Sequence, residues 1–168
     1  MKALVFSDSH GDISPLDGLI KRFNPEFVFG LGDYGVSKYE LDELNVLGVK
    51  GNSYLDPEYP LDFLYDSKLN NLKILFTHGH THNVRSSLLS LSLFAKDKKA
   101  DIVFYGHTHV AKIIEDDSLI IVNPGSLGRP YSPTFPTVAI INATKEKIKI
   151  DIVDASTYEI YKTLERIR

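Results

Sequence analysis

The stretch ALVFSDSH, residues 3–10, carries the pattern on which the fold prediction rests: four apolar residues run directly into a polar cluster. Four more segments repeat this pattern, each a run rich in Val, Ile, Leu and Phe followed by Asp, Asn or His, and they are 27–33, 46–52, 72–80 and 102–109. Near-continuous apolar runs are typical of strands buried in a parallel sheet. Because ligands bind beyond the carboxyl ends of such strands, we expect the five polar clusters to meet at one place.

The composition predicts one globular domain that spans residues 1–168. The chain is long enough for one substantial core, and 43% hydrophobic with 24% charged residues is ordinary for a soluble protein. No apolar stretch approaches the ~20 residues needed to cross a bilayer, and the start at Met1 shows no secretory signal pattern. We therefore expect a cytoplasmic protein with no membrane partner, and a homo-oligomer remains open.

The chain contains no cysteine, so disulfides and thiolate chemistry are excluded and any metal must have nitrogen and oxygen ligands. Such ligands favour Mn, Fe, Ni, Zn or Mg. The net charge of −3 shows no global excess of basic residues. This charge predicts a small phosphorylated substrate and no duplex nucleic acid as partner.

Between and after the apolar runs, periodicity predicts the remaining elements. Helices are expected from Ser14-Pro15 to Phe23, over 38–44 and over 86–94, and antiparallel pairs at 110–122 and 137–153. The spacing of apolar residues over 158–165 predicts a C-terminal helix, with a short last strand as the alternative. A mainly parallel half followed by a mainly antiparallel half suggests two sheets packed together with helices outside.

The polar clusters have the residue types of a metal site. Asp8 and His10 are two positions apart, as are His107 and His109, so each pair would point to one side if the strand continued. Asp33 offers a carboxylate that can bridge two ions, and convergent polar groups without partners usually mark a site. The loop 52–60 follows one of these clusters, and its tyrosines either line a substrate mouth or pack on the surface.

The ordered series Asp8-x-His10, Gly32-Asp33, Gly51-Asn52, His78-Gly79 and Gly106-His107-x-His109 resembles the calcineurin-like metallophosphoesterases from the first strand to about residue 130. The short chain and the sequence Asn123-Pro124-Gly125-Ser126 resemble the small bacterial and archaeal phosphodiesterases of that superfamily. The resemblance implies an α/β fold of four layers, with two mixed β-sheets face to face and helices on both outer faces.

The resemblance also implies a dinuclear centre of divalent ions, with Mn expected first and Ni, Fe or Zn as alternatives. One ion would be held by Asp8, His10, Asp33 and His109, and the other by Asp33, Asn52, His78 and His107. A hydroxide that bridges the ions would attack the phosphorus of a phosphodiester. The implied activity is a metal-dependent phosphodiesterase with Asp33, Asn52 and His78 as catalytic residues, and we add His80 to them for the reason given below.

Two rival functions use the same fold. One is a non-catalytic scaffold, as in the retromer subunit of this superfamily, and the other is a metal-binding regulatory module. The scaffold hypothesis expects lost ligands, whereas all seven ligand candidates are present in this chain.

The chain departs from the resemblance at Ser53-Tyr54, where many relatives have a histidine or cysteine and then an acidic residue. The usual proton donor to the leaving group is therefore missing, and His80 and His82 are the available substitutes. Arg85 and Arg129 are candidates for phosphate contacts, with ion pairing as the alternative for each.

Overall fold

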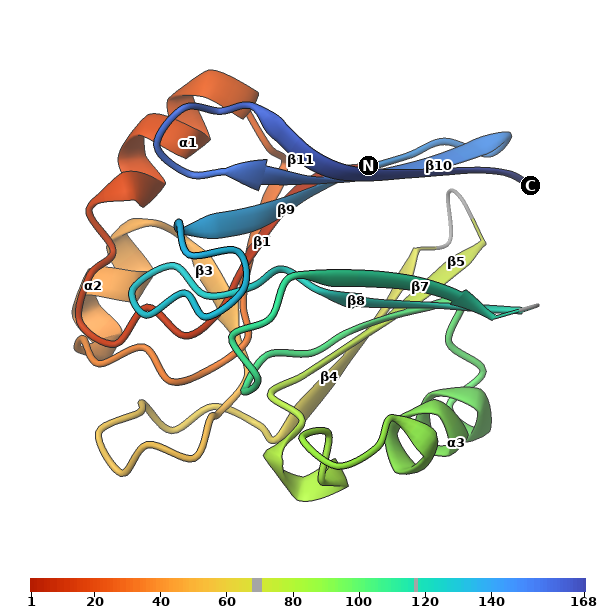
Figure 1. Cartoon of the computed structure of the whole chain (residues 1–168), viewed down its shortest axis with the longest axis horizontal. Helices are drawn as coiled ribbons and strands as arrows, with labels where there is room; N and C mark the ends of the chain where they lie inside the picture. Colours follow the sequence, from red (N-terminus) through yellow and green to blue (C-terminus); the bar gives the residue numbers. More distant parts are fainter. Residues whose placement is uncertain (68–70, 117) are drawn as a thin grey trace.

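The computed structural model describes residues 1–67, 71–116 and 118–168. Two β-sheets face each other, and helices cover the outer face of each sheet (Figure 1). This arrangement confirms the predicted α/β class with two mixed sheets flanked by helices.

The first sheet has the strand order β11–β10–β9–β1–β2–β3. Its parallel part is β1–β2–β3, and the other strands pair antiparallel. The strands are β1 Lys2–Phe6, β2 Phe27–Gly30, β3 Val46–Gly48, β9 Thr137–Ala143, β10 Lys147–Asp154 and β11 Ile160–Ile167. The helices α1 Pro15–Phe23 and α2 Lys38–Glu43 pack on its outer face.

The second sheet has the strand order β4–β5–β6–β8–β7. Here β5, β6 and β8 run parallel, and the edge strands β4 and β7 pair antiparallel with their neighbours. The strands are β4 Asp62–Ser67, β5 Leu72–Thr77, β6 Ile102–Phe104, β7 Lys112–Asp116 and β8 Leu119–Asn123. Helix α3 Leu89–Asp97 covers its outer face, and a short 3₁₀ helix, His80–His82, follows β5.

The apolar core lies in three layers, which explains why the first strands are apolar without interruption. Ala3 and Val5 face the space between the sheets, whereas Leu4 and Phe6 pack beneath α1. Between the sheets, the ring of Phe76 stacks on the rings of Phe29 and Phe104, with centroids 4.1 and 5.6 Å apart. Strands buried on both faces cannot show the alternation of polar and apolar residues that half-exposed strands show.

The structure corrects three details of the prediction and adds that β9, from the antiparallel half, pairs with β1 of the parallel half. The C-terminal helix is wrong and the alternative is right, since β11 is a strand paired with β10. The strand β4 was not predicted. Pro15 begins α1 as expected, but Ser14, the expected N-cap, makes no side-chain capping bond. Both predicted antiparallel pairs are present, but Asp117 in the first turn lies outside the described residues.

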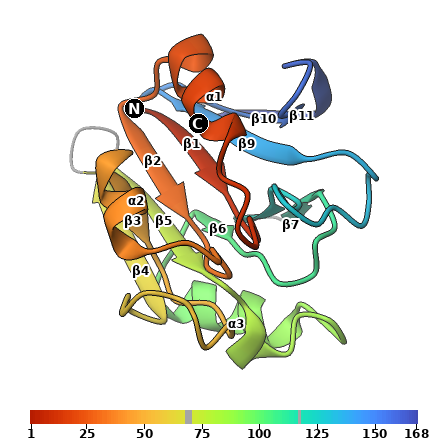
Figure 2. The same cartoon turned by 90° about the vertical axis from the view of Figure 1, so that its left-hand side faces the viewer.

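The topology brings the polar clusters to one end of the molecule. The parallel strands β1, β2, β5 and β6 deliver their C-terminal loops to this end, which faces the viewer in Figure 2. No helix in the described ranges is long and apolar enough to span a membrane.

Candidate metal centre

Five of the ligand candidates have a left-handed backbone. The φ angles are 53° for Asp8, 45° for His10, 53° for Asp33, 65° for His107 and 58° for His109. This conformation is uncommon for residues other than glycine and is enriched at functional sites. Asp8 and His10 therefore do not continue the strand, as their spacing suggested, but reach the same place through a tight turn.

The turn after β1 is fixed by the loop after β2. The backbone N–H of Asp8 donates to the carbonyl oxygen of Gly32 at 3.1 Å, and that of His10 donates to the carbonyl oxygen of Asp33 at 3.0 Å. These bonds hold Asp8 and Asp33 side by side although 25 positions separate them.

One group of candidate ligands consists of Asp8, His10 and His109. The ligand atoms of these residues lie within 4.8 Å of one another. Nε2 of His109 is 3.2 Å from Oδ1 of Asp8 and 3.2 Å from Nε2 of His10. Oδ1 of Asp8 is buried and has no hydrogen-bond partner of suitable geometry among the described residues. Ring nitrogens that face a buried, unbonded carboxylate oxygen fit a divalent cation between them.

A second group surrounds His78. Nε2 of His78 lies 3.1 Å from Oδ1 of Asn52, 3.2 Å from Nδ1 of His107 and 3.6 Å from Oδ2 of Asp33. Ligand atoms of Asp8, Asp33 and His78 also lie within 4.8 Å of one another, so the two groups adjoin. The structure thus brings together all seven residues that were predicted as metal ligands.

Two histidines are oriented by hydrogen bonds to backbone carbonyls. Nδ1 of His78 lies 2.7 Å from the carbonyl oxygen of Leu31, and Nδ1 of His109 lies 2.7 Å from that of Arg129. A carbonyl can only accept, so each Nδ1 carries the proton and each Nε2 is free to bind a metal.

The local electrostatics favours the protonation states in which Asp8 and His107 can bind a metal ion. Burial acts to raise the pKa of Asp8, yet His109, His78 and Ser7 together lower it below its ordinary value. Burial, the neighbouring His78 and Arg85 lower the pKa of His107 to about 4. An ionised carboxylate and a neutral imidazole are the forms that bind metal ions. The contact with Asp8 has the opposite effect on His109, whose pKa it raises.

Asp56 is a buried residue that the sequence analysis missed. Its Oδ2 accepts the backbone N–H groups of Asp33 and Gly51 at 2.7 Å, and its Oδ1 accepts that of Tyr34 at 2.8 Å. The carboxylate therefore ties the loop of Asp33 to the loop of Asn52. Its only sequence signal is an acidic residue four positions after Asn52, a pattern that is common in surface loops.

Gly51 belongs to the same junction. A Cβ atom at this position would overlap with Oδ1 of Asp33 and lie 2.7 Å from Oδ2 of Asp56. Only glycine leaves room for the close approach of these two carboxylates to the backbone.

The two candidate proton donors differ in position. The ring of His80 lies 5.3 Å from that of His78 and 6.3 Å from that of His107, and its buried Nδ1 has no partner within the described chain. The ring of His82 instead lies against that of Phe94, tilted by 31° with centroids 4.6 Å apart. His80 is therefore beside the ligand cluster and His82 packs on α3.

The remaining candidates lie around the rim. Arg85 and Arg129 are exposed, and neither forms an ion pair in the part of the chain that the structure describes, so the ion-pairing alternative is not observed. Tyr59 packs against Tyr34, with ring centroids 5.8 Å apart, whereas Tyr54 is 93% exposed. Of the two tyrosines in the loop 52–60, Tyr59 thus packs within the protein.

The fold and the cluster of nitrogen and oxygen ligands at its strand ends define the class of metallophosphoesterases. The family model described as the calcineurin-like phosphoesterase superfamily domain matches residues 1–146, and the chain belongs to this family. The family uses divalent metal ions, and the ligand groups described above fit such ions.

Known proteins agree with this assignment. A phosphodiesterase from Methanocaldococcus jannaschii is 26% identical over 168 residues, which cover 89% of this chain and 97% of that protein. A crystal structure of a predicted phosphoesterase from Streptococcus pneumoniae superposes with a TM-score of 0.86 at 27% identity and covers 99% of this chain and 97% of the other. The zinc complex of Vps29 from Entamoeba histolytica has a TM-score of 0.79 at 22% identity over 99% of both chains, which shows likeness of fold.

Proposed function

We propose that this protein is a phosphodiesterase that depends on two divalent ions, with Mn as the first candidate and Ni, Fe or Zn as alternatives. The observation that carries the proposal is the pair of adjoining ligand groups around Asp8, Asp33 and His78. The archaeal relative named as a phosphodiesterase supports the same activity.

The residues divide between two ions in the proposed centre. Asp8, His10 and His109 would hold one, Asn52, His78 and His107 would hold the other, and Asp33 would serve both. Two ions so held would supply a water that is acidic enough to act as hydroxide near neutral pH and would neutralise charge on the phosphate oxygens.

The protein's own groups keep these ligands in place. Asp33 accepts the backbone N–H groups of Asn52 and Ser53 on Oδ1, each at 2.8 Å, which leaves Oδ2 directed at His78. The N–H of His107 donates to Oδ2 of Asp8 at 3.0 Å, and the hydroxyl of Ser7 donates to the same oxygen at 2.5 Å. Each carboxylate thus uses one oxygen for the fold and keeps the other for the site.

His80 is the proposed proton donor to the leaving oxygen. Many relatives have a histidine or cysteine at the position of Ser53. His80 would replace that residue as proton donor, because its ring lies beside His78 and His107. Its buried Nδ1, which has no hydrogen-bond partner among the described residues, is the supporting observation.

The test is hydrolysis of bis(p-nitrophenyl) phosphate by the purified protein with and without added Mn. We expect turnover that a chelator abolishes and that added metal restores. Folded protein without metal-dependent turnover, across Mn, Ni, Fe and Zn, would contradict the proposal and favour the scaffold hypothesis.

A further inference from the structure

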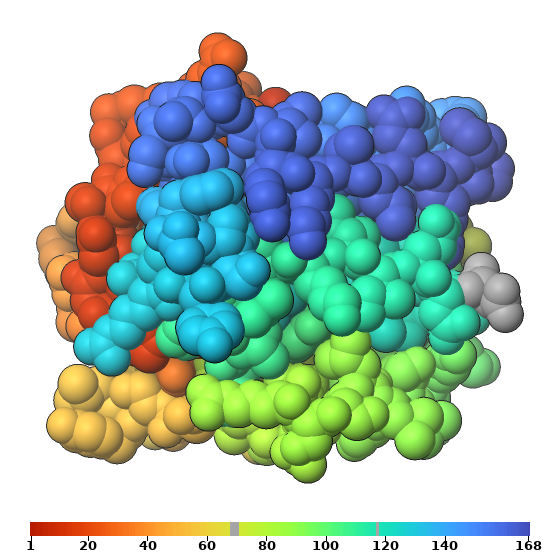
Figure 3. Space-filling view, viewed as in Figure 1, coloured from red at the N-terminus to blue at the C-terminus, as the bar shows by residue number. Residues whose placement is uncertain are grey.

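Two adjoining hollows lie beside the candidate ligand His109. The first is an open hollow of about 440 Å³, lined by Arg85, Thr108, His109, Val110 and Tyr131. A second hollow of about 470 Å³ shares Arg85, Thr108 and Val110 and extends to Lys112. We call the two together the Tyr131 groove. In Figure 3 the segments around residues 85, 108 and 131, in yellow-green, green and cyan, meet on the same face.

The position of Tyr131 is fixed relative to the metal centre. The backbone N–H groups of Tyr131 and Ser132 donate to the carbonyl oxygen of His109 at 3.1 and 3.3 Å. The N–H of Ala111 donates to the carbonyl of Ser132 at 2.7 Å. The loop of Tyr131 is therefore tied to the loop between β6 and β7 that holds the candidate ligand His109, while Tyr131 is 76% exposed. An anchored backbone with an exposed ring provides a flat surface for a planar ligand.

Arg85 supplies a cation to the hollow that His109 and Tyr131 also line. One guanidinium nitrogen donates to the carbonyl oxygen of His107 at 3.3 Å, and no carboxylate lies within 4.0 Å of the group among residues 1–67, 71–116 and 118–168. Its other N–H groups remain available to a phosphate oxygen, which guanidinium binds well. Thr108 adds a hydroxyl that accepts from Asn123 at 3.0 Å and has a proton left to donate.

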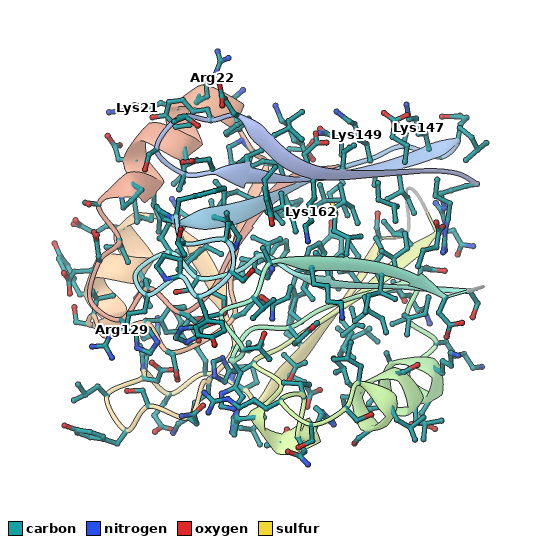
Figure 4. The ribbon with its side chains drawn as sticks, viewed as in Figure 1. Lys21, Arg22, Arg129, Lys147, Lys149 and Lys162 are labelled. Carbon is teal, nitrogen blue, oxygen red and sulfur yellow. The ribbon has the colours of Figure 1, made fainter. Side chains whose placement is uncertain are left out.

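The distribution of basic residues favours a small ligand over a nucleic-acid strand. Figure 4 shows Lys21 and Arg22 on α1 and Lys147 and Lys149 on β10, away from Arg129 near the ligand loops. Lys21, Lys147 and Lys149 are paired with Asp17, Glu165 and Asp151. Lys112 lines the groove and Lys162 donates to the carbonyl oxygen of Ala111 next to it, so the groove is locally basic, but the hollow has the size of a small-molecule site.

We propose that the Tyr131 groove binds the nucleoside arm of a phosphodiester, with the base stacked on Tyr131 and a phosphate oxygen held by Arg85. This inference rests on the proposed phosphodiesterase function and names its substrate class. An exposed aromatic ring next to a cation suits a base and its phosphate, because every base has a face that can stack.

The test compares two diesters with the same leaving group. Thymidine 5′-(p-nitrophenyl) phosphate carries a nucleoside arm and methyl p-nitrophenyl phosphate carries only a methyl group, so the ratio of their kcat/KM values measures the contribution of the nucleoside. We expect the Tyr131→Ala variant to lower this ratio about tenfold, because the loss of one aromatic residue that stacks on a base has an effect of about this size. Tyr131→Phe should retain the ratio, and so should Tyr39→Ala, which removes an exposed tyrosine from α2.

A binding measurement separates this inference from the proposed activity. Equilibrium dialysis of the wild type should show that adenosine monophosphate binds about tenfold more tightly than ribose 5-phosphate, which lacks only the base. Tyr131→Ala should abolish that preference. An unchanged kinetic ratio in Tyr131→Ala, or equal binding of the two phosphates to the wild type, overturns the inference. If neither diester is hydrolysed, the proposed activity fails and the dialysis alone decides whether the groove recognises a base.

Discussion

At the scale of single residues, the centre depends on side chains that have two functions at once. Asp8 and Asp33 each bind backbone or hydroxyl groups with one carboxylate oxygen and direct the other toward imidazole nitrogens. His78 and His109 each donate from Nδ1 to a carbonyl and leave Nε2 free. Hydrogen bonds within the fold thus orient the candidate ligand atoms, as the outer-shell partners of metal ligands do.

Asp33→Asn tests this division within one carboxylate. The amide keeps an oxygen that can accept from Asn52 and Ser53, so the fold should persist, but it loses the negative charge that both ions would share. We expect phosphodiesterase activity to fall at least about 100-fold, since changes even outside the ligand shell cost 10–100-fold, and bound metal to decrease. Elemental analysis and hydrolysis assays measure both effects. Asp17→Asn, an exposed carboxylate paired with Lys21, is the matched control, and an equally active Asp33→Asn would refute the assignment.

His80→Ala tests the proposed proton donor. Loss of a general acid should slow diesters with phenol as leaving group by about 100-fold and affect p-nitrophenol esters far less, because a weakly basic oxygen leaves without protonation. The measurement is the dependence of kcat on the pKa of the leaving group. His82→Ala is the control, as that ring packs on Phe94. Equal losses for all leaving groups would show instead that His80 only supports His78.

The sequence predicted which candidate ligands meet better than it predicted the residues that hold them. The seven candidate ligands follow apolar strands, and the rule that parallel strands end at one edge was enough to predict that they lie together. Asp56 could not be found this way, because it binds backbone groups of residues 33, 34 and 51 and such contacts require no characteristic side chain. The left-handed backbone at Asp8 and His10 was also beyond a pattern that assumed continued strand geometry.

At the scale of elements, the centre is a junction between loops, and the carboxylate of Asp56 accepts three backbone N–H groups of this junction. Its removal in Asp56→Ala would leave three buried N–H groups without an acceptor. We expect a loss of about 2–4 kcal/mol in the free energy of unfolding and weaker metal binding. Urea denaturation and metal titration check this prediction. Glu58→Ala in the same loop removes an exposed carboxylate and should change little; similar stability of the two variants would contradict the role of Asp56.

The C-terminal strand shows why one element was misassigned. Tyr158, Tyr161 and Leu164 have helical spacing, but in β11 the half-buried positions are Lys162, Leu164 and Arg166, which alternate as in a strand. Lys162 donates to the carbonyl oxygen of Ala111, and Arg166 donates to the carboxylate of Glu115, which lies on β7. Two of the three inward positions are thus charged and contact another part of the chain, so a reading based on apolar residues alone could not detect the alternation.

At the scale of the whole molecule, the candidate ligands come from both sheets. Asp8, Asp33 and Asn52 follow strands of the first sheet, whereas His78, His107 and His109 follow strands of the second. Ions bound between them would join the two sheets. Because a ligand that binds only the folded state stabilises it, Mn should raise the melting temperature of the wild type and have little effect on Asp33→Asn. Thermal unfolding at several Mn concentrations measures the shift, and equal shifts in both proteins would place the metal elsewhere.

The most direct test of the central claim is a titration of metal-free protein with Mn, in which bound metal and the hydrolysis of bis(p-nitrophenyl) phosphate are followed in the same samples. Two adjoining ligand groups predict two ions per chain, with full activity only when both are bound. Saturation at a single ion with full activity would contradict the dinuclear centre. Two bound ions without turnover would contradict the catalytic function.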